Sequence, residues 1–180
     1  EEIIFETANS FAFVDPTLAS DHSANRKDMQ YYNEAIYCYY LEDYEGAMRA
    51  AKQALKLGSI KASYLLIELY YDEDSPYRDV EKTISYAKQL FEATKDPELA
   101  FLLGIVYDQQ LKDYVKAVNW YENAERLGHK RVAFYLGRIY YYGLLRTKRD
   151  GVKALSYFKK ARENGIQEAE GYIKDLEDLK

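Results

Sequence analysis

The chain has very little cysteine and histidine, and this restricts the chemistry it can support. Its 180 residues include one cysteine, Cys38, and two histidines. A single cysteine excludes an internal disulfide bond and leaves no cysteine cluster for zinc. No apolar run approaches the 18 residues that a membrane-spanning helix needs, and no glycine-rich phosphate-binding loop is present. The sequence therefore predicts no metal centre and no bound cofactor.

Candidate catalytic residues are equally scarce. His22 lies in a polar stretch and His129 follows a glycine expected to end a helix, so both are predicted to be surface residues without a catalytic partner. The 30 acidic residues scatter over loops and outer helix faces. We therefore predict that the protein is not an enzyme. Its formal net charge of −5 also disfavours a general nucleic-acid or anionic-membrane binder.

The most informative feature of the sequence is a pattern of residues that occurs twice between Leu99 and Gly165. A period in the thirties, with small residues at helical spacing, predicts stacked helical hairpins. In the first half of the pattern, the residues that recur at one constant offset are Ala100 and Ala133, Leu103 and Leu136, Gly104 and Gly137, and Tyr107 and Tyr140. In the second half, which follows a loop of different length, they are Ala117 and Ala154, Trp120 and Tyr157, Ala124 and Ala161, and Gly128 and Gly165.

Four of these glycines have predictable structural roles. A glycine in the middle of a helix costs about 1 kcal/mol relative to alanine. Gly104 and Gly137 are therefore expected where two helix backbones approach closely. Gly128 and Gly165 are expected to end the second helix of each hairpin, where a left-handed residue is favoured.

The repeated order is Ala-x-x-Leu-Gly-x-x-Tyr, a loop, Lys-Ala-x-x-Trp/Tyr-Tyr/Phe-x-x-Ala and a final Gly. This order resembles SEL-1-like repeats, which are relatives of the tetratricopeptide repeat, and the likeness covers roughly residues 29–176. It implies an all-α fold, a right-handed α-α superhelix (solenoid) of about four helical hairpins with N- and C-terminal capping helices. The single cysteine departs from the branch of this family that pairs its cysteines.

The pattern predicts one solenoid domain over residues 1–180. The expected parts are an N-terminal cap at 1–27, repeats at 28–59, 60–96, 97–129 and 130–166, and a C-terminal capping helix at 167–180. The polar outer positions of the last segment are those that a terminal cap needs for solubility.

A candidate binding surface follows from the resemblance, because the first helices of tetratricopeptide-like hairpins line the concave face of the superhelix. Side chains there are expected to be exposed to solvent, yet most of them are aromatic or branched aliphatic. A contiguous exposed apolar patch of this kind usually marks a binding surface. The predicted partner-binding residues are Tyr32, Ile36, Tyr39, Ile67, Tyr70, Phe101, Ile105, Asp108, Phe134, Arg138 and Tyr141, with Asp108 and Arg138 as orienting charges.

Three alternatives to a partner site stay open for this apolar surface. Residues 1–20 fold back into the groove, tight curvature buries the side chains, or two chains self-associate there. A second candidate surface is basic, and it is either a solvated rim or a surface that steers an acidic partner. Its members are Lys130, Arg131, Arg146, Lys148 and Arg149.

These observations predict a non-enzymatic adaptor or scaffold that binds a partner protein or an extended peptide in its concave groove. The alternative is an immunity or inhibitor protein that caps a toxic effector enzyme, and a third reading is a structural segment of a longer chain. The resemblance makes the bacterial cell envelope a plausible setting. The chain begins without methionine, so the expected compartment is the periplasm if a signal peptide was removed and the cytoplasm otherwise.

Overall fold

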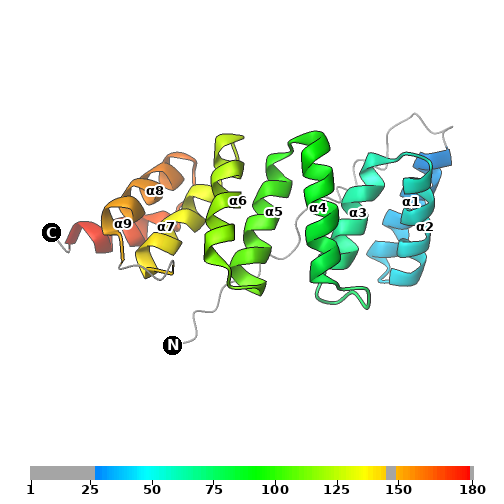
Figure 1. Cartoon of the computed structure of the whole chain (residues 1–180), viewed down its shortest axis with the longest axis horizontal. Coiled ribbons are helices and arrows are strands. Elements are labelled where there is room, and N and C mark those ends of the chain that lie inside the picture. Colours follow the sequence, from blue (N-terminus) through cyan, green and yellow to red (C-terminus); the bar gives the residue numbers. More distant parts are fainter. Residues whose placement is uncertain (1–26, 145–148, 179–180) are drawn as a thin grey trace. The chain divides into compact units, whose positions relative to one another are not determined.

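The computed structural model describes residues 27–144 and 149–178, and all regular structure within these ranges is helical (Figure 1). The predicted all-α fold is therefore confirmed. The chain divides into two compact units, and the boundary between Ala87 and Lys88 falls inside helix α4. The N-terminal segment expected to cap the first repeat, with His22, and the loop residues Arg146 and Lys148 lie outside the described residues.

The N-terminal unit is built on a helical hairpin followed by a third helix. Helix α1 packs along α2, and α2 packs against α3. The buried core between them consists mainly of alanine, leucine and tyrosine side chains. The helices of this unit are α1 (Lys27–Tyr40), α2 (Tyr44–Lys56), α3 (Ile60–Tyr71) and the first half of α4 (Val80–Thr94).

The C-terminal unit contains two successive hairpins and a last helix. Helix α5 packs against α6, α7 against α8, and α8 against α9. After the second half of α4, its elements are α5 (Pro97–Ile105), a π-helical turn η2 (Val106–Gln110), α6 (Tyr114–Arg126), α7 (Val132–Tyr142), α8 (Gly151–Glu163) and α9 (Ala169–Asp178).

An aspartate begins each of the helices α2, α4, α6 and α8. In each case the carboxylate accepts a hydrogen bond from the backbone N–H three residues later, which satisfies one unpaired donor of the first turn. The backbone N–H of the same aspartate donates back to a carbonyl near the end of the preceding helix. The four aspartates are Asp43, Asp79, Asp113 and Asp150, and the carbonyls belong to Cys38, Tyr70, Tyr107 and Tyr140. Loops of different length are therefore closed in the same way.

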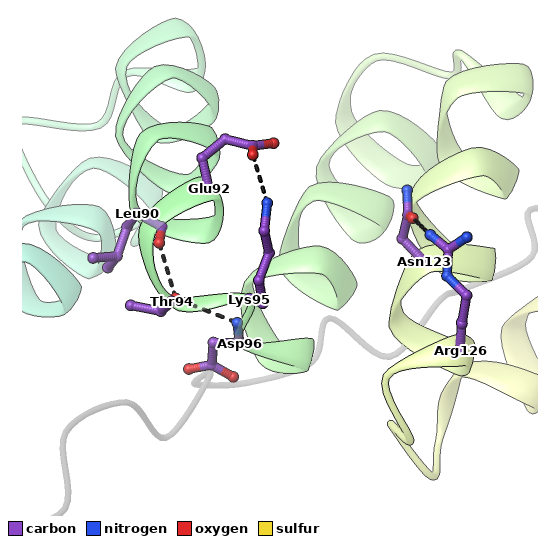
Figure 2. Close-up of polar contacts among 7 residues, drawn as sticks. All are labelled: Leu90, Glu92, Thr94, Lys95, Asp96, Asn123 and Arg126. Carbon is purple, nitrogen blue, oxygen red and sulfur yellow. Dashed lines mark hydrogen bonds and ion pairs between the residues drawn. The ribbon is translucent and has the colours of Figure 1, made fainter.

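Glycine ends three of these four helices. Gly58, Gly128 and Gly165 have φ angles of 89°, 91° and 88°, so the left-handed ends predicted for the last two are confirmed. Helix α4 ends differently, at Lys95, with a φ of 53°. Figure 2 shows this turn: the Thr94 hydroxyl donates to the Leu90 carbonyl at 2.9 Å, and the Asp96 N–H donates to Thr94 Oγ1 at 3.3 Å.

The two mid-helix glycines lie where helices approach closely, as predicted. A Cβ atom placed on Gly104 would lie 2.3 Å from Cδ1 of Tyr121, and one placed on Gly137 would lie 2.8 Å from Cδ1 of Phe158. Both rings are fully buried. The absence of a side chain on α5 and α7 therefore lets an aromatic ring of α6 and α8 lie directly on the helix backbone.

Candidate functional site

Most of the predicted groove residues are buried, which contradicts the exposure expected for them. The structure leaves four of the eleven partly exposed. Those four are Tyr39, Phe134, Arg138 and Tyr141, whereas Tyr32, Ile36, Ile67, Tyr70, Phe101, Ile105 and Asp108 are buried. The buried side chains are part of the packing inside each unit, so the expectation of a continuous exposed apolar surface is wrong.

Phe101 shows the physical reason for this burial. Its ring stacks on His129 with the ring centres 4.1 Å apart, and it meets the edge of Tyr135 at 5.1 Å. His129 lies between α6 and α7, and Tyr135 lies on α7, so the next hairpin covers this position of α5. A first helix in a stack of hairpins thus contacts its own second helix and the following hairpin. Side chains that share the face of α5 on which Phe101 lies are therefore covered by these neighbouring helices.

Asp108 is buried against its own hairpin. It lies in the π-helical turn η2, where the extra residue rotates the side chain relative to α5. Its carboxylate accepts a hydrogen bond from the Tyr121 hydroxyl at 3.0 Å. Burial raises the pKa of Asp108, while this hydrogen bond and the charge of Arg138 act in the opposite direction. The carboxylate is therefore part of the packing and cannot reach a partner.

His129, predicted at the surface, is also buried. Its Nε2 lies 3.3 Å from a carboxylate oxygen of Glu98 at the start of α5. The hydrogen bond from His129 lowers the pKa of Glu98, and burial opposes part of that shift. The turn after Gly128 places the imidazole under Phe101, so this histidine joins the two hairpins of the C-terminal unit.

In the N-terminal unit, Tyr39 is partly exposed but its hydroxyl is already bonded. It donates to Asp72 Oδ2 at 3.0 Å, and the Tyr44 hydroxyl reaches the same oxygen at 3.4 Å. Glu68 lies one helical turn before Asp72 and is buried, and its pKa is raised to about 8 by burial and by the Asp72 charge. These side chains connect the first hairpin to the end of α3.

The other three partly exposed residues lie together on α7. Phe134, Arg138 and Tyr141 follow Arg131, the residue that precedes the helix, at spacings of three, seven and ten. This spacing places all four on one face of the helix. Arg131 is exposed, and the other three are partly exposed. We call Arg131, Phe134, Arg138 and Tyr141 the α7 stripe.

The aromatic members of the α7 stripe are backed by other rings of the same unit. Phe134 lies 5.9 Å from Phe158, and Tyr141 meets Tyr172 of α9 edge-on at 5.1 Å. Tyr172 stacks on Phe158 at 4.5 Å, and burial and its hydrogen-bonding neighbour Tyr142 raise the pKa of Tyr172 to about 12. This backing holds the stripe's rings in fixed positions while leaving one side partly open to solvent.

Cations lie over both rings of the α7 stripe. The guanidinium carbon of Arg138 lies 5.9 Å from the centre of the Phe134 ring. That of Arg149 lies 5.0 Å from the Tyr141 ring, and its Nε donates to the Tyr141 carbonyl at 2.9 Å. Distances below about 6 Å are those of attractive cation–π contacts. The stripe therefore alternates basic and aromatic groups along one helix face.

Within residues 27–144 and 149–178, no group of three or more histidine, cysteine or acidic side chains is placed to hold a metal ion. No helix in these ranges is long and apolar enough to cross a membrane. The α7 stripe can bind a ligand through its aromatic rings and through the N–H donors of its guanidinium groups.

Comparison with known families identifies the two hairpins of the C-terminal unit. The Sel1 repeat family model matches residues 97–129 and 131–166, which correspond to α5 with α6 and to α7 with α8. These two segments are therefore Sel1 repeats, and the resemblance inferred from the sequence is confirmed for them. No curated protein matches the chain. Sel1 repeats are generally protein-interaction modules and are typically not catalytic.

Proposed function

We propose that this protein is a non-enzymatic adaptor that binds a partner protein, or an extended segment of one, through the α7 stripe. Two Sel1 repeats support the general role of protein interaction. The choice of surface rests on exposure: of the predicted groove residues, the set on α7 stays partly exposed and lies on one helix face.

The observation that carries the proposal is the contrast between the stripe's exposure and its composition. Phe134 and Tyr141 are large rings that keep an open side at a fixed position, because Phe158 and Tyr172 pack behind them. Rigid aromatic groups bind at a low cost in conformational entropy, and aromatic and arginine side chains are enriched in the energetic centres of protein interfaces.

Affinity capture with matched variants tests this function. The full chain, Tyr141→Ser and Tyr157→Ser are immobilised and exposed to a lysate of the cells that make the protein. Tyr157 is a matched control, because it is also partly exposed but lies on α8, stacked on Tyr140 and away from the stripe. We expect a partner that the wild type and Tyr157→Ser retain and that Tyr141→Ser loses, with helicity by circular dichroism equal in all three. Equal capture by all three variants would refute the α7 stripe as the binding surface.

The nature of the captured partner separates the adaptor from an inhibitor of a toxic enzyme. An adaptor is expected to bind a short linear fragment of its partner nearly as well as the whole partner, because one helix face contacts a short segment. An inhibitor needs the folded enzyme and reduces its turnover. Fragment binding without any effect on turnover supports the adaptor.

A further inference from the structure

We propose that the segment bound by the α7 stripe is acidic, with two carboxylates three residues apart and an apolar side chain between them. This inference rests on the proposed function, since it assigns a partner chemistry to the same surface. It would also explain the basic cluster around Arg131 and Arg149, for which the sequence left two readings open.

The arrangement of charge along α7 supports this partner. Arg131 and Arg138 are seven residues apart on one face, which separates them by about 10.5 Å along the helix axis. Phe134 lies between them. A segment in the polyproline II conformation has three residues per turn and advances about 3.1 Å per residue, so carboxylates three positions apart lie on one face and are about 9 Å apart. Such a segment brings one carboxylate near each guanidinium and places the residues between them at the level of the Phe134 ring.

Arg149 extends the basic surface beyond the end of α7. Its Nε bond to the Tyr141 carbonyl holds the guanidinium over the Tyr141 ring at 5.0 Å. That bond uses one of the five N–H donors of the group. Guanidinium groups bind carboxylates well because their planar set of donors matches the two carboxylate oxygens.

The carboxylates of α5 and η2 are already engaged. Asp108 is buried and accepts the Tyr121 hydroxyl, and Glu98 lies 3.3 Å from His129. Burial raises the pKa of Asp108, the charge of Arg138 opposes only part of that rise, and the carboxylate stays inside the unit. Asp108 therefore cannot rise to the surface to replace a partner carboxylate, whereas Glu98 is exposed and its pKa is lowered by His129 and, to a smaller extent, by the charge of Arg131.

The distribution of charge over the whole chain favours a short acidic segment over a nucleic acid. Residues 1–87 contain 8 basic and 16 acidic side chains, whereas residues 88–180 contain 17 basic and 14 acidic ones. The net charge of −5 disfavours a long polyanion, whereas a segment of a few residues interacts only with the local charges of α7.

Peptide binding to the full chain tests this inference. The probe is a labelled, end-capped heptapeptide in which two glutamates three positions apart enclose a leucine. Its counterparts carry two glutamines or two lysines in place of the glutamates. We expect the glutamate peptide to bind at least ten times more tightly than the glutamine peptide, and its affinity to fall several-fold between 50 mM and 500 mM salt. Equal affinity for the three peptides, tighter binding of the lysine peptide, or no binding at millimolar concentration would each overturn the acidic chemistry.

Single substitutions locate the binding. Arg138→Gln and Arg149→Gln should each weaken the glutamate peptide about five- to ten-fold and change binding of the glutamine peptide little. Arg126→Gln is the matched control, because Arg126 is exposed at the end of α6 and bonds to Asn123 of its own helix (Figure 2). Equal weakening by Arg126→Gln would show a non-specific effect of net charge and overturn the inference.

Two outcomes separate this inference from the proposed function. If Tyr141→Ser loses the partner but the chain binds the three peptides equally well, the adaptor function is supported and the acidic partner is refuted. Sedimentation of the chain alone tests a second copy as the occupant. A dimer that Arg138→Gln dissociates would overturn the proposal in favour of self-association, whereas a monomer supports a separate partner.

Discussion

The inner faces of the two Sel1 repeats differ in charge and in exposure. The α7 stripe is basic and aromatic and is partly exposed, whereas the equivalent residues Glu98, Phe101, Ile105 and Asp108 of the first repeat include two acidic groups and are mostly buried. We call these four residues the α5 set. Equivalent positions in the two repeats therefore differ in exposure. The hairpin of α7 and α8 covers the α5 set, whereas α9 covers less of the α7 stripe.

The largest expected difference between the two repeats concerns their phenylalanines. Phe101→Ala should lower the free energy of unfolding by about 3–4 kcal/mol, because it empties a site enclosed by His129, Tyr121 and Tyr135. Phe134→Ala should cost about 1–2 kcal/mol, because that ring is partly exposed. Urea unfolding of both variants measures the difference. Equal losses would contradict the different burial of the two repeats.

A second comparison uses the glycines under the aromatic rings. Gly104→Ala should destabilise the chain by about 1–3 kcal/mol, and more than Gly137→Ala, because its Cβ would lie closer to a buried ring. Gly137→Leu should lower the free energy of unfolding by about 1–3 kcal/mol, because the larger side chain overpacks the hairpin. Gly171→Ala on α9 is the control: no atom lies near its Cβ, so alanine should stabilise the helix by up to about 1 kcal/mol. Thermal melting ranks the variants, and a Gly104→Ala variant as stable as the wild type would be inconsistent with this packing.

The buried acid of the α5 set predicts a dependence of stability on pH. Burial raises the pKa of Asp108, so the folded chain binds this proton at a higher pH than the unfolded chain does. The resulting stabilisation is complete below the unfolded pKa of about 4 and is lost as the pH rises through the raised folded value. Relative to Asp108→Asn, the wild type should therefore gain stability as the pH falls from 7 to 4. Urea midpoints across this range measure it, and parallel curves for the two proteins would disprove it.

The smallest expected effect is on the stability of the stripe variants. Arg138→Gln should change the free energy of unfolding by less than about 0.5 kcal/mol, because partly exposed charges contribute little to folding. A loss of partner binding in this variant would then reflect the interface alone. A loss of more than about 2 kcal/mol would place Arg138 in the fold and remove it from the binding surface.

The repeat register was predictable from the sequence, because it depends on local rules. Gly104 and Gly137 were placed at close helix contacts, and Gly128 and Gly165 at left-handed helix ends, and the structure confirms all four. Small residues and caps act within one hairpin, so spacing alone locates them. The right-handed sense of the superhelix and the grouping of residues 1–180 as one solenoid stay predictions.

The exposure of the inner face was not predictable in the same way. Helical spacing tells which side chains share a face, but coverage of that face depends on the neighbouring hairpin, as Phe101 and His129 show. One signal was present: Arg138 occupies the position that isoleucine holds in the other three repeats, at Ile36, Ile67 and Ile105. A charged side chain is rarely buried unless it is paired. The arginine at this position therefore indicates that the α7 stripe is partly exposed. Nothing in the residue spacing predicts the π-helical turn η2 that contains the buried Asp108.

Hydroxyl-radical footprinting of the full chain most directly tests the central claim, that the inner face is open on α7 and closed on α5. Oxidation of individual aromatic side chains is read by mass spectrometry. The structure predicts rapid oxidation of Phe134 and Tyr141 and protection of Phe101 and Tyr121. Equal oxidation of all four rings, or greater oxidation of Phe101 than of Phe134, would contradict it.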